Sequence, residues 1–439
     1  MAARKPKKEK RGARMAAMGA GIAGSYLGYV FQSPFLGKEG RARKLKATHT
    51  RVGQRMRDEM QELRGPAMKL GQTLSHQSGI VPDEMMAQLA TLQMQAPGMH
   101  PSLMRAQFEG SMGAPPDDLF RDFDDMPFAA ASLGQVHRAV TREGEDVVVK
   151  IQYPAIRDAI ASDFAALRRL SRPAQVTGHV PPAVLDELES GILAETDYRR
   201  EAENIEFLRK RLKPLSFVST PRVLPKLSSE QVLTMSRVGG SHLQEFLSRR
   251  PSQKVRDAIG ENLFDLFYFQ ILSVGAFHAD PHAGNYLFDK EGNVGLVDFG
   301  CVKYLEAPFV ADLRELYLYP GPRNSDHFKS LLDRRYRRVG KNLNRMARRA
   351  FVEVAENFFG RVYPPEPGKE SETFDFGRSP IVVEYTRETQ KLFRGKALLP
   401  QYVFLGRAEI GLYDMLHRLG ARVHTSRIVR RNLRRARAD

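Results

Sequence analysis

Three polar residues around one predicted β-hairpin constrain the fold of this chain more than any other feature. Asp280 is followed, after four intervening residues, by Asn285, which leads into the apolar run 286–288. A turn that contains glycine then precedes a second apolar run, 294–297, and Asp298. Two short apolar runs around such a turn predict a β-hairpin, which would bring Asn285 and Asp298 side by side. Their side-chain oxygens could then ligate one hard cation, with water and phosphate completing its shell.

The spacing of these residues is that of a protein-kinase catalytic loop. In kinases the first Asp accepts the proton of the acceptor hydroxyl, whereas the Asn and the Asp of a later Asp-Phe-Gly hold magnesium on ATP. Residues 298–300 read Asp-Phe-Gly here, but residues 278–280 read His-Ala-Asp where kinases have His-Arg-Asp. We therefore predict that Asp280 is in the catalytic-base position and that Asn285 and Asp298 bind Mg²⁺. We expect chemistry on ATP other than ordinary protein phosphorylation.

Two histidines, His278 and His282, flank Asp280. They could ligate a metal, but two histidines without a third ligand at suitable spacing favour a structural role. No Ser or Cys with an attendant base suggests itself, so a covalent nucleophile is not predicted. One cysteine, Cys301, excludes an intrachain disulfide and fits a reducing compartment.

Residues 128–136 match the glycine-rich loop of kinases, G-x-G-x-x-G-x-V, with two glycines replaced by alanine. The loop positions are Ala129, Ala130, Ala131, Ser132, Gly134 and Val136. Each added methyl group restricts the backbone angles that glycine allows, so we expect the loop to lie differently on the phosphates of ATP. By itself this match is weak, and an alanine-rich strand end is the alternative.

Lys150 follows three β-branched residues, Val147 to Val149, in the position of the lysine in a kinase V-A-I-K. A lysine at the end of a buried strand needs an anionic partner, because an unpaired buried ammonium is costly. The phosphates of ATP and a carboxylate on a helix would serve. The alternative is a lysine whose charged head reaches solvent. The surrounding kinase-like spacing favours the first interpretation.

Hydrophobic patterning divides the rest of the chain into helical and extended parts. Apolar residues at helical spacing predict helices within 41–95, and the pattern changes from Pro127 onward. Two strands, 128–140 and 146–152, are predicted around a polar turn that contains glycine. Further predicted elements are helices at about 155–171, 183–213 and 253–275, a strand at 232–240, and mainly helix after Gly300.

The net charge of +17 is concentrated in three stretches. Residues 1–14 and 421–439 each carry +6, residues 41–57 carry +7, and the remainder is close to neutral. No aromatic-studded basic platform, zinc spacing or reader motif lies between them, so nucleic acid is not expected as a partner. Basic ends beside a near-neutral body suit an anionic lipid membrane at least as well. The alternative for the C-terminal stretch is a solubilising, partly disordered end.

An uncharged segment, residues 15–37, lies between the first two basic stretches. Its first seventeen residues, 15–31, would span roughly 26 Å as a helix, slightly short of a ~30 Å hydrocarbon core. Gly24 and Gly28 have the G-x-x-x-G spacing that lets two membrane helices approach closely, so a homodimer through them is one of the expected partners. We expect a marginal membrane anchor that either spans the bilayer or lies in its interface. A buried glycine-rich helix and a targeting segment are the alternatives.

Residues 69–72 read Lys-Leu-Gly-Gln and complete a set of motifs that resembles the UbiB/AarF family of atypical kinase-like proteins. That family is linked to ubiquinone biosynthesis in bacteria and mitochondria. The resemblance covers roughly residues 50–310, and the motifs agree in order and spacing. They are the K-x-G-Q of Lys69, Gly71 and Gln72, the alanine loop, Lys150, the E-x-D of Glu195 and Asp197, and the set Asp280, Asn285 and Asp298.

The resemblance implies roles for individual residues. Lys150 would contact the α- and β-phosphates of ATP and pair with a helix carboxylate, for which we choose Glu201. The K-x-G-Q extension would fold across the site where a kinase receives its peptide, with Lys69 meeting Glu195 and Gln72 near the phosphates. An occluded site of this kind suits hydrolysis of ATP or transfer to a small acceptor.

These observations together predict an α+β, bilobal protein-kinase-like fold with an N-terminal helical extension and a mostly helical C-terminal lobe. The predicted parts are a basic tail and apolar anchor (1–40), the extension (41–126), an N-lobe (127–238), a C-lobe with a helical extension (239–425) and a basic tail (426–439).

The predicted function is that of an Mg²⁺-dependent ATPase that supports isoprenoid-quinone synthesis. The expected place is the cytoplasmic face of a bacterial inner membrane, with the mitochondrial inner membrane as the alternative. Expected partners besides ATP are anionic lipid and quinone intermediates or their biosynthetic enzymes. A nucleotide-gated scaffold without catalysis, and a phosphotransferase acting on a small molecule or a protein, are the alternative functions.

Overall fold

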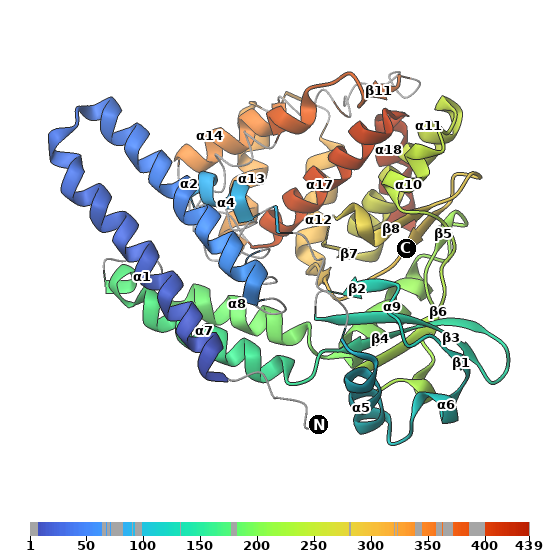
Figure 1. Cartoon of the computed structure of the whole chain (residues 1–439). Helices are drawn as coiled ribbons and strands as arrows, with labels where there is room; N and C mark the ends of the chain where they lie inside the picture. Colours follow the sequence, from blue (N-terminus) through green and yellow to red (C-terminus); the bar gives the residue numbers. More distant parts are fainter. Residues whose placement is uncertain are drawn as a thin grey trace. The chain divides into compact units, whose positions relative to one another are not determined.

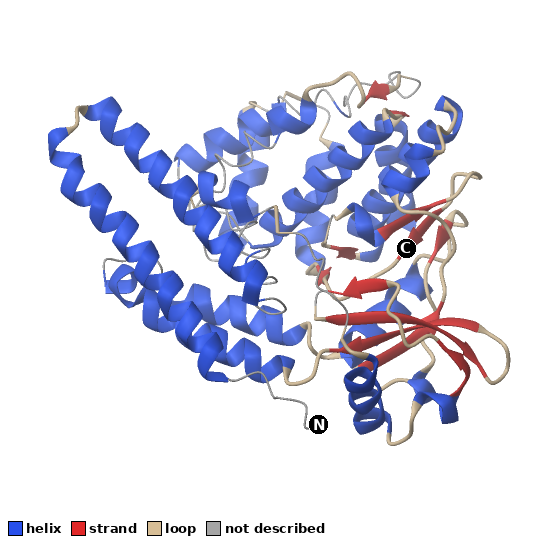
Figure 2. Ribbon diagram, viewed as in Figure 1, coloured by secondary structure: helices blue, strands red, loops and turns tan. Residues whose placement is uncertain are grey.

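The computed structural model describes most of the 439 residues of the chain. The described residues are 8–63, 67, 71, 82–89, 91–92, 99–131, 133–176, 182–280, 282–319, 321–322, 324–338, 345–356, 362, 372–385 and 400–438. The chain divides into two compact units, the first made of Met1–Arg200 and Val223–Ser236 and the second of Glu201–Arg222 and Arg237–Asp439. Figure 1 labels their elements, and Figure 2 distinguishes helices from strands.

The first unit contains a five-stranded antiparallel sheet (Figure 2). Its strands are β1 (Phe120–Phe123), β2 (Ala129–Ala131), β3 (Gly134–Thr141), β4 (Asp146–Gln152) and β6 (Val232–Ser236). They pair in the order β1-β3-β4-β6, and β2 also pairs with β3. β3 and β4 form the predicted hairpin, whose turn contains Gly144 with a φ of +89°, a conformation that favours glycine. The predicted strand 146–152 and the turn before it are confirmed, whereas the predicted strand 128–140 is divided into β2 and β3, which pair with each other.

The core of the sheet is the β-branched face of β4. Val147, Val149 and Ile151 are at most 1% exposed, and they share an apolar cluster with Met104 and Phe108 of α5 (Pro101–Met112). The pattern follows from strand geometry, because residues two apart point to the same face of a sheet. Two short helices, α6 (Pro116–Leu119) and η2 (Pro225–Leu227), contact β1 and β6 respectively.

The other helices of the first unit form a helical body. They are α1 (Lys8–Gln32), η1 (Ser33–Phe35), α2 (Lys38–Leu63), α4 (Asp83–Leu89), α7 (Ile156–Val176) and α8 (Pro182–Ala194). α1 and α2 form a helical hairpin (Figure 1), and α1 also packs on α7. An apolar cluster that includes Met18, Met60, Leu89, Phe164 and Ile192 joins these helices. Helices predicted within 41–95 are therefore present as α2 and α4.

The uncharged segment 15–37 lies in α1, η1 and the start of the connection to α2. Among the helices of the described ranges, none combines the length and the hydropathy that crossing a membrane requires. α1 buries one of its faces: Met18 is 2% exposed, and Ile22 packs against the same apolar cluster.

The single helix predicted over 183–213 is wrong, because the chain forms two helices, α8 and α9 (Tyr198–Arg211). Asp197 begins the second one, since its Oδ1 accepts a hydrogen bond from the backbone N–H of Arg199 at 3.0 Å. The carbonyl of Thr196 accepts a hydrogen bond from the side-chain amide of Gln152 in β4. The turn between the two helices is therefore tied to the sheet.

The second unit is organised around the apolar helix α11 (Gln253–Phe269), which packs on α17 and α18. Besides most of α9, the described helices of this unit include α10 (Leu243–Ser248), η4 (Ala283–Asn285), α12 (Ala307–Leu318), α13 (Asp326–Arg338), α14 (Arg345–Val354), α17 (Pro400–Leu419) and α18 (Thr425–Ala438). The helix predicted to run to 275 ends at Phe269 and continues as a π-helical turn, η3 (Gln270–Val274). That turn stops at Gly275, whose φ is +70°.

Three small sheets complete the second unit. β5 (Val218–Ser219), β9 (Val294–Leu296) and β8 (Tyr286–Phe288) pair in that order. β10 (Val302–Tyr304) pairs with β7 (Ala276–His278), and β11 (Phe374–Asp375) pairs with β12 (Arg422–Val423). The hairpin predicted between 286 and 297 is confirmed as β8–β9.

The C-terminal basic stretch is a helix, α18, rather than a disordered end. Its apolar face is buried, with Ile428 and Leu433 at most 2% exposed. Asp265 of α11 is buried beneath it. Its carboxylate accepts a hydrogen bond from the side-chain amide of Asn432 at 2.7 Å and forms an ion pair with Arg431 at 2.8 Å. The buried carboxylate therefore has the charged and hydrogen-bonding partners that make its burial tolerable.

Candidate active site

The candidate residues divide between the two units. The alanine loop, Lys150 and the E-x-D turn belong to the first unit, whereas Glu201, Asp280, Asn285 and Asp298 belong to the second. Gly71 is buried in the first unit, where a side chain at this position would meet Leu92 and Met60. Lys69, Gln72 and Ser132 lie outside the described residues.

The alanine loop is a short β-hairpin made by β2 and β3. Ala129 pairs with Val136, Ala130 with Gln135, and Ala131 with Gly134. Ala129 and Ala130 are exposed, whereas Ala131 is buried. The alanines thus form the outer strand of this hairpin, and its other strand, β3, also pairs with β4.

Gly134 is required by the packing of β3 on β4. A Cβ atom at this position would lie 2.2 Å from the carbonyl oxygen of Ile151 and 2.9 Å from the hydroxyl oxygen of Tyr198. The first contact is with backbone, which cannot move aside without breaking the strand pairing. The close approach of the two strands thus explains this glycine without reference to a ligand.

Lys150 lies in the middle strand of the sheet, paired with Val136 of β3 and Leu233 of β6. Its side chain is buried, at 7% exposure, so the alternative of a charged head reaching solvent is wrong. The Nζ atom is 5.2 Å from the centre of the Tyr198 ring, a cation–π contact that partly offsets the cost of burial.

The E-x-D turn is held from both sides. Besides the contact of Thr196 with Gln152, the Thr196 hydroxyl oxygen accepts a hydrogen bond from Nε of Arg157 at 2.9 Å. Arg157 also pairs with Glu230 at 2.6 Å. Glu195 and Asp197 are partly buried in this turn, and Asp197 acts there as the cap of α9. The motif is therefore a well-supported corner of the first unit.

In the second unit, the β8–β9 hairpin brings the predicted catalytic residues together. The backbone N–H of Val297 donates to the carbonyl of Asn285 at 3.0 Å, which places Asn285 and Asp298 at the same end of the hairpin. The side-chain amide of Asn285 donates to Oδ2 of Asp280 at 2.8 Å. Because the amide nitrogen is used in this way, the Oδ1 atom of Asn285 remains for a cation.

Asp298 has an unusual backbone conformation, with a φ of +67°. Its Oδ1 accepts a hydrogen bond from the N–H of Gly300 at 3.1 Å, and its carbonyl oxygen contacts Nε2 of His278 at 2.5 Å. A carbonyl only accepts, so Nε2 of His278 must carry the proton. Non-glycine residues in this region of backbone space are typical of functional sites, where the surroundings hold them in place.

The two histidines have structural partners. His278 holds the carbonyl of Asp298, and Nδ1 of His282 accepts a hydrogen bond from Gly284 N at 3.1 Å at the start of η4. Within the described ranges, no group of three or more His, Cys, Asp or Glu side chains could hold a metal ion. Asn285 and Asp298 nevertheless fit Mg²⁺, which proteins usually bind with one or two carboxylates together with substrate phosphates and water.

The Asp-Phe-Gly segment is fastened to α9. The buried carboxylate of Glu201 accepts a hydrogen bond from Phe299 N at 3.2 Å, and the amide of Asn204 donates to Phe299 O at 3.0 Å. The Asn204 side-chain oxygen also accepts a hydrogen bond from the hydroxyl of Tyr304 at 2.8 Å. Sequence reasoning missed Asn204, although it lies three residues after Glu201 and therefore on the same helix face.

Arg407 of α17 is a second residue that sequence reasoning missed. Burial lowers the pKa of its guanidinium, and the nearby acidic groups Cys301 and Asp280 raise it. An arginine remains protonated in proteins, so a positive charge is present close to Asp280. Residues 278–280 read His-Ala-Asp, with alanine where the kinase motif has its arginine.

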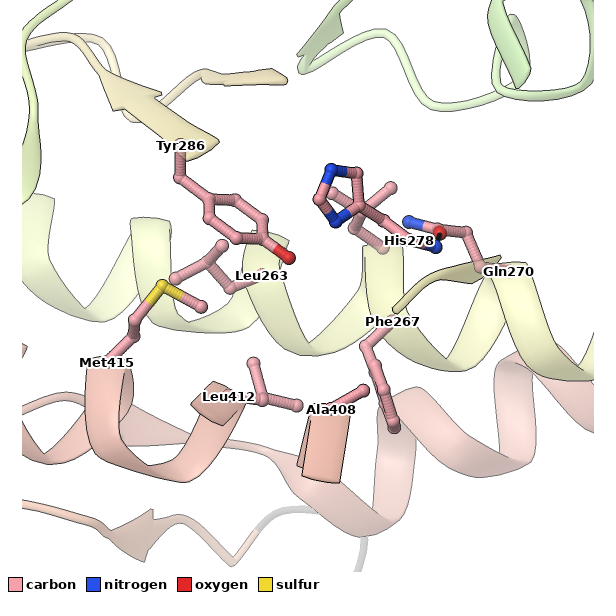
Figure 3. Close-up of a pocket in the computed structure, with 9 residues that line it drawn as sticks. Leu263, Phe267, Gln270, His278, Tyr286, Ala408, Leu412 and Met415 are labelled. Atoms are coloured by element: carbon pink, nitrogen blue, oxygen red, sulfur yellow. Dashed lines mark hydrogen bonds between the residues drawn. The ribbon is translucent and has the colours of Figure 1, made fainter. Parts of the chain in front are cut away.

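A small cavity lies behind the catalytic segment (Figure 3). It is lined by His278 and Tyr286 on one side and by apolar residues of α11 and α17 on the other. Burial, and then the charge of Asp280, raises the pKa of Tyr286, so its hydroxyl stays neutral. The cavity measures about 10 Å³, room for about one water molecule, and it is too small to hold a substrate.

Comparison with known proteins gives a consistent result. Residues 91–331 match the profile of the ABC1 atypical kinase-like domain. Atypical kinase COQ8, mitochondrial, of Saccharomyces cerevisiae is 26% identical over 382 residues, which cover 85% of this chain and 74% of that protein. Probable protein kinase UbiB of Aliivibrio fischeri is 33% identical over 291 residues, covering 63% of this chain and 53% of that protein.

Two further relatives extend the comparison. The chloroplastic protein ACTIVITY OF BC1 COMPLEX KINASE 7 of Arabidopsis thaliana is 29% identical over 304 residues, covering 68% of this chain and 42% of that protein. The chain thus spans about half, or less, of several of the curated relatives it matches. Among solved structures, Rv3197 of Mycobacterium tuberculosis in complex with erythromycin has a TM-score of 0.59 and 24% identity, covering 84% of this chain and 92% of that one. This last likeness shows the fold alone.

Proposed function

Because the chain belongs to the ABC1 atypical kinase-like family, which includes UbiB and COQ8, we propose that it binds Mg²⁺·ATP and hydrolyses the nucleotide slowly. Its kinase-like α+β fold follows from the same match. The observation that carries the proposal is the group at the end of the β8–β9 hairpin. There the side chain of Asn285 donates a hydrogen bond to Asp280 at 2.8 Å, and Asp298 lies at the same end of the hairpin.

Each residue of this group has a distinct part in the proposed reaction. Mg²⁺ bound with ATP would neutralise negative charge on the phosphoryl oxygens. Asn285 and Asp298 would hold it, since they lie at the same end of the hairpin and offer the amide and carboxylate oxygens that Mg²⁺ prefers. Asp280 would orient the attacking water and accept its proton.

In the first unit, Lys150 is proposed to contact the α- and β-phosphates. Its support is its burial at a central strand position and the ring of Tyr198 beneath its ammonium group. The pairing of Lys150 with Glu201 remains a prediction from the family, as does the meeting of Lys69 with Glu195. Glu201 accepts a hydrogen bond from the backbone N–H of Phe299.

Hydrolysis is favoured over transfer to a protein by two departures from kinases. Two glycines of the phosphate loop are replaced by Ala129 and Ala131, and residues 278–280 read His-Ala-Asp instead of His-Arg-Asp. A membrane role in isoprenoid-quinone synthesis is proposed from the family resemblance, at the cytoplasmic face of a bacterial inner membrane or, alternatively, at the mitochondrial inner membrane. Anionic lipid and quinone intermediates or their enzymes are the proposed partners.

The test is nucleotide binding and hydrolysis by the purified full-length chain. We expect Mg²⁺-dependent ATP hydrolysis that rises with anionic lipid or a phenolic quinone precursor. Asp298→Asn should lower hydrolysis by about 10²-fold or more, because it removes a charge that stabilises the metal and the transition state. Asp118→Asn is the matched control, since Asp118 is an exposed carboxylate in the first unit.

Two outcomes would decide against hydrolysis. Nucleotide binding that is unchanged when Lys150 and Asp298 are both replaced would contradict the proposed site. Tight Mg²⁺-nucleotide binding without turnover under any lipid condition would favour the scaffold alternative. Profiling of quinone intermediates in cells that carry wild type or Asp298→Asn would then test the biosynthetic role.

A further inference from the structure

Large apolar side chains are exposed together at the tip of the α1–α2 hairpin. Leu27, Val30, Phe31 and Phe35 are 56%, 57%, 74% and 88% exposed. Over the described ranges, ten large apolar side chains are exposed, and four of these ten lie within the nine positions 27–35. Figure 1 shows the connection between α1 and α2 at the free end of this hairpin, away from α7 and α8 of the same unit. Concentrated exposed apolar surface of this kind marks an interaction site.

The exposed side chains belong to a face of α1 that the first unit does not cover. Its opposite face is occupied: Met18 and Ile22 lie in the apolar cluster, and Tyr26 contacts the ring of His49 at 6.0 Å. On the uncovered side, a Cβ atom added at Gly24 or Gly28 would have no described atom within 4 Å. Ala20, Gly24, Leu27 and Phe31 recur there at intervals of three and four residues, which is one stripe of a helix.

Basic residues follow immediately after the apolar tip. No charged residue occurs over 15–37, and then Lys38, Arg41, Arg43 and Lys46 are all exposed in the first turns of α2, with Glu39 as the one acid among residues 38–46. An apolar surface beside exposed cations complements a surface that has an apolar interior and anionic head groups. Long basic side chains can also reach outward to head groups while their stems contact acyl chains.

We propose that the α1–α2 tip is a wedge that docks into the interface of an anionic lipid bilayer. Phe31 and Phe35 would enter below the head groups, and Lys38, Arg41 and Arg43 would meet the lipid phosphates. The inference deepens the proposed membrane association, and it replaces a spanning anchor with one that enters a single leaflet. A second copy of the chain is a poorer occupant, because two such tips would bring like charges together.

The test is flotation of the full-length protein with phosphatidylcholine vesicles that contain or lack phosphatidylglycerol. Phe31→Ser/Phe35→Ser should weaken binding by at least about tenfold, because the transfer of two apolar rings from water into the bilayer is lost. Lys38→Gln/Arg41→Gln/Arg43→Gln should weaken binding to anionic vesicles by about fivefold per residue and should leave binding to neutral vesicles unchanged. Added salt should reduce the loss of binding caused by the Lys/Arg substitutions and leave the loss caused by the Phe substitutions unchanged.

The matched control is Leu103→Ser/Val383→Ser, which removes apolar side chains that are 47% and 70% exposed elsewhere. It should bind vesicles as wild type does. Wild-type binding by the Phe31→Ser/Phe35→Ser variant, or absence of flotation by the wild type, would overturn the proposal. A lipid-free dimer that the same variant converts to monomer, without any flotation, would assign the face to a second copy and also overturn it.

The outcome is separable from that of the proposed function, because Mg²⁺-ATP binding is measured on the same samples. Tip variants that lose vesicles and keep nucleotide binding support the wedge. If Asp298→Asn instead hydrolyses ATP as wild type does while the tip variants lose vesicles, the proposed hydrolysis fails and the wedge stands.

Discussion

The two hairpins that carry candidate site residues are built in opposite ways. All residues of β8 and β9 are buried, and side chains fasten both ends of that hairpin. Asp280 accepts a hydrogen bond from Asn285 at one end, and Asp289 accepts one from Asn293 at the other. In the β2–β3 hairpin, by contrast, the outer strand has two exposed alanines and pairs only along its backbone with β3 in the described contacts.

This difference suggests different parts for the two hairpins in the proposed chemistry, each considered within its own unit. Groups that ligate a cation need positions held within fractions of an ångström, and buried strands with fastened ends provide them. A segment that covers a flexible triphosphate can be looser, and an edge strand with small side chains has little that would hold it. We therefore expect substitutions at the β8–β9 hairpin to change catalysis and substitutions at β2 to change little. Each of the following predictions would break or sharpen this contrast.

The largest effect is expected for Asn285→Ala. The change removes one proposed metal ligand and the hydrogen bond to Asp280, so ATP hydrolysis should fall by about 10²–10³-fold. Asn293→Ala is the control, because it removes a hydrogen bond of the same kind from the far end of the same hairpin. Steady-state hydrolysis at several Mg²⁺ concentrations measures both. Equal losses in the two variants would show that the hairpin acts only through its stability.

The next effect concerns stability rather than catalysis. Gly134→Ala would place a Cβ atom 2.2 Å from the carbonyl oxygen of Ile151, so the free energy of unfolding should fall by about 1–3 kcal/mol. Gly110→Ala is the matched control: Gly110 is exposed in the helix α5 and has open space around it. Alanine there should raise the free energy of unfolding by about 0.5–1 kcal/mol. Urea denaturation measures both, and a Gly134→Ala variant as stable as wild type would refute the packing explanation.

The hairpins could be predicted from sequence because their signals are local. The turn between β3 and β4 and the turn between β8 and β9 each contain a glycine with positive φ, Gly144 and Gly292, between short apolar runs. Asp280, Asn285 and Asp298 came with the second hairpin, since its register alone places 285 beside 298. Spacing along the chain was sufficient information for this part of the site.

The rest depended on contacts between distant segments. The break between α8 and α9 is stabilised by Gln152, more than forty positions earlier, which no helical periodicity could reveal. Arg407 reaches the neighbourhood of Asp280 from a helix more than a hundred residues later. The sequence of α18 predicts a basic tail, and the ion pair between Arg431 and Asp265 of α11 shows that the segment is packed. In each case the deciding partner was tertiary, so propensity and charge pattern gave an incomplete or wrong prediction.

A smaller effect is expected at the connection between the catalytic hairpin and α9. Asn204→Ala removes the hydrogen bond to Phe299 O, and the free energy of unfolding should fall by about 1 kcal/mol. Because Phe299 follows Asp298, the Mg²⁺ dependence of nucleotide binding should weaken as well. Tyr304→Phe is the control, since it removes the hydroxyl that donates to Asn204 and leaves the Asn204 side chain in place. Titration calorimetry with Mg²⁺ and ATP measures the effect, and an unchanged Mg²⁺ dependence would place the rigidity of Asp298 in the hairpin alone.

The smallest effect is expected for Ala129→Gly in the exposed strand β2. The residue is exposed and its backbone pairing with Val136 can persist, so the cost in stability should stay below about 1 kcal/mol. Nucleotide affinity should change by less than about threefold, because no side-chain contact to phosphate is lost. Ala130→Gly, one position along the same strand, is the control for the greater backbone freedom that glycine brings.

Incubation with labelled ATP then distinguishes hydrolysis from phosphoryl transfer. Autophosphorylation that rises in Ala129→Gly would favour a phosphotransferase whose loop the alanine had restrained. Undetectable phosphorylation in both variants, with hydrolysis retained, agrees with chemistry that is set by the buried β8–β9 hairpin and not by the alanine strand β2.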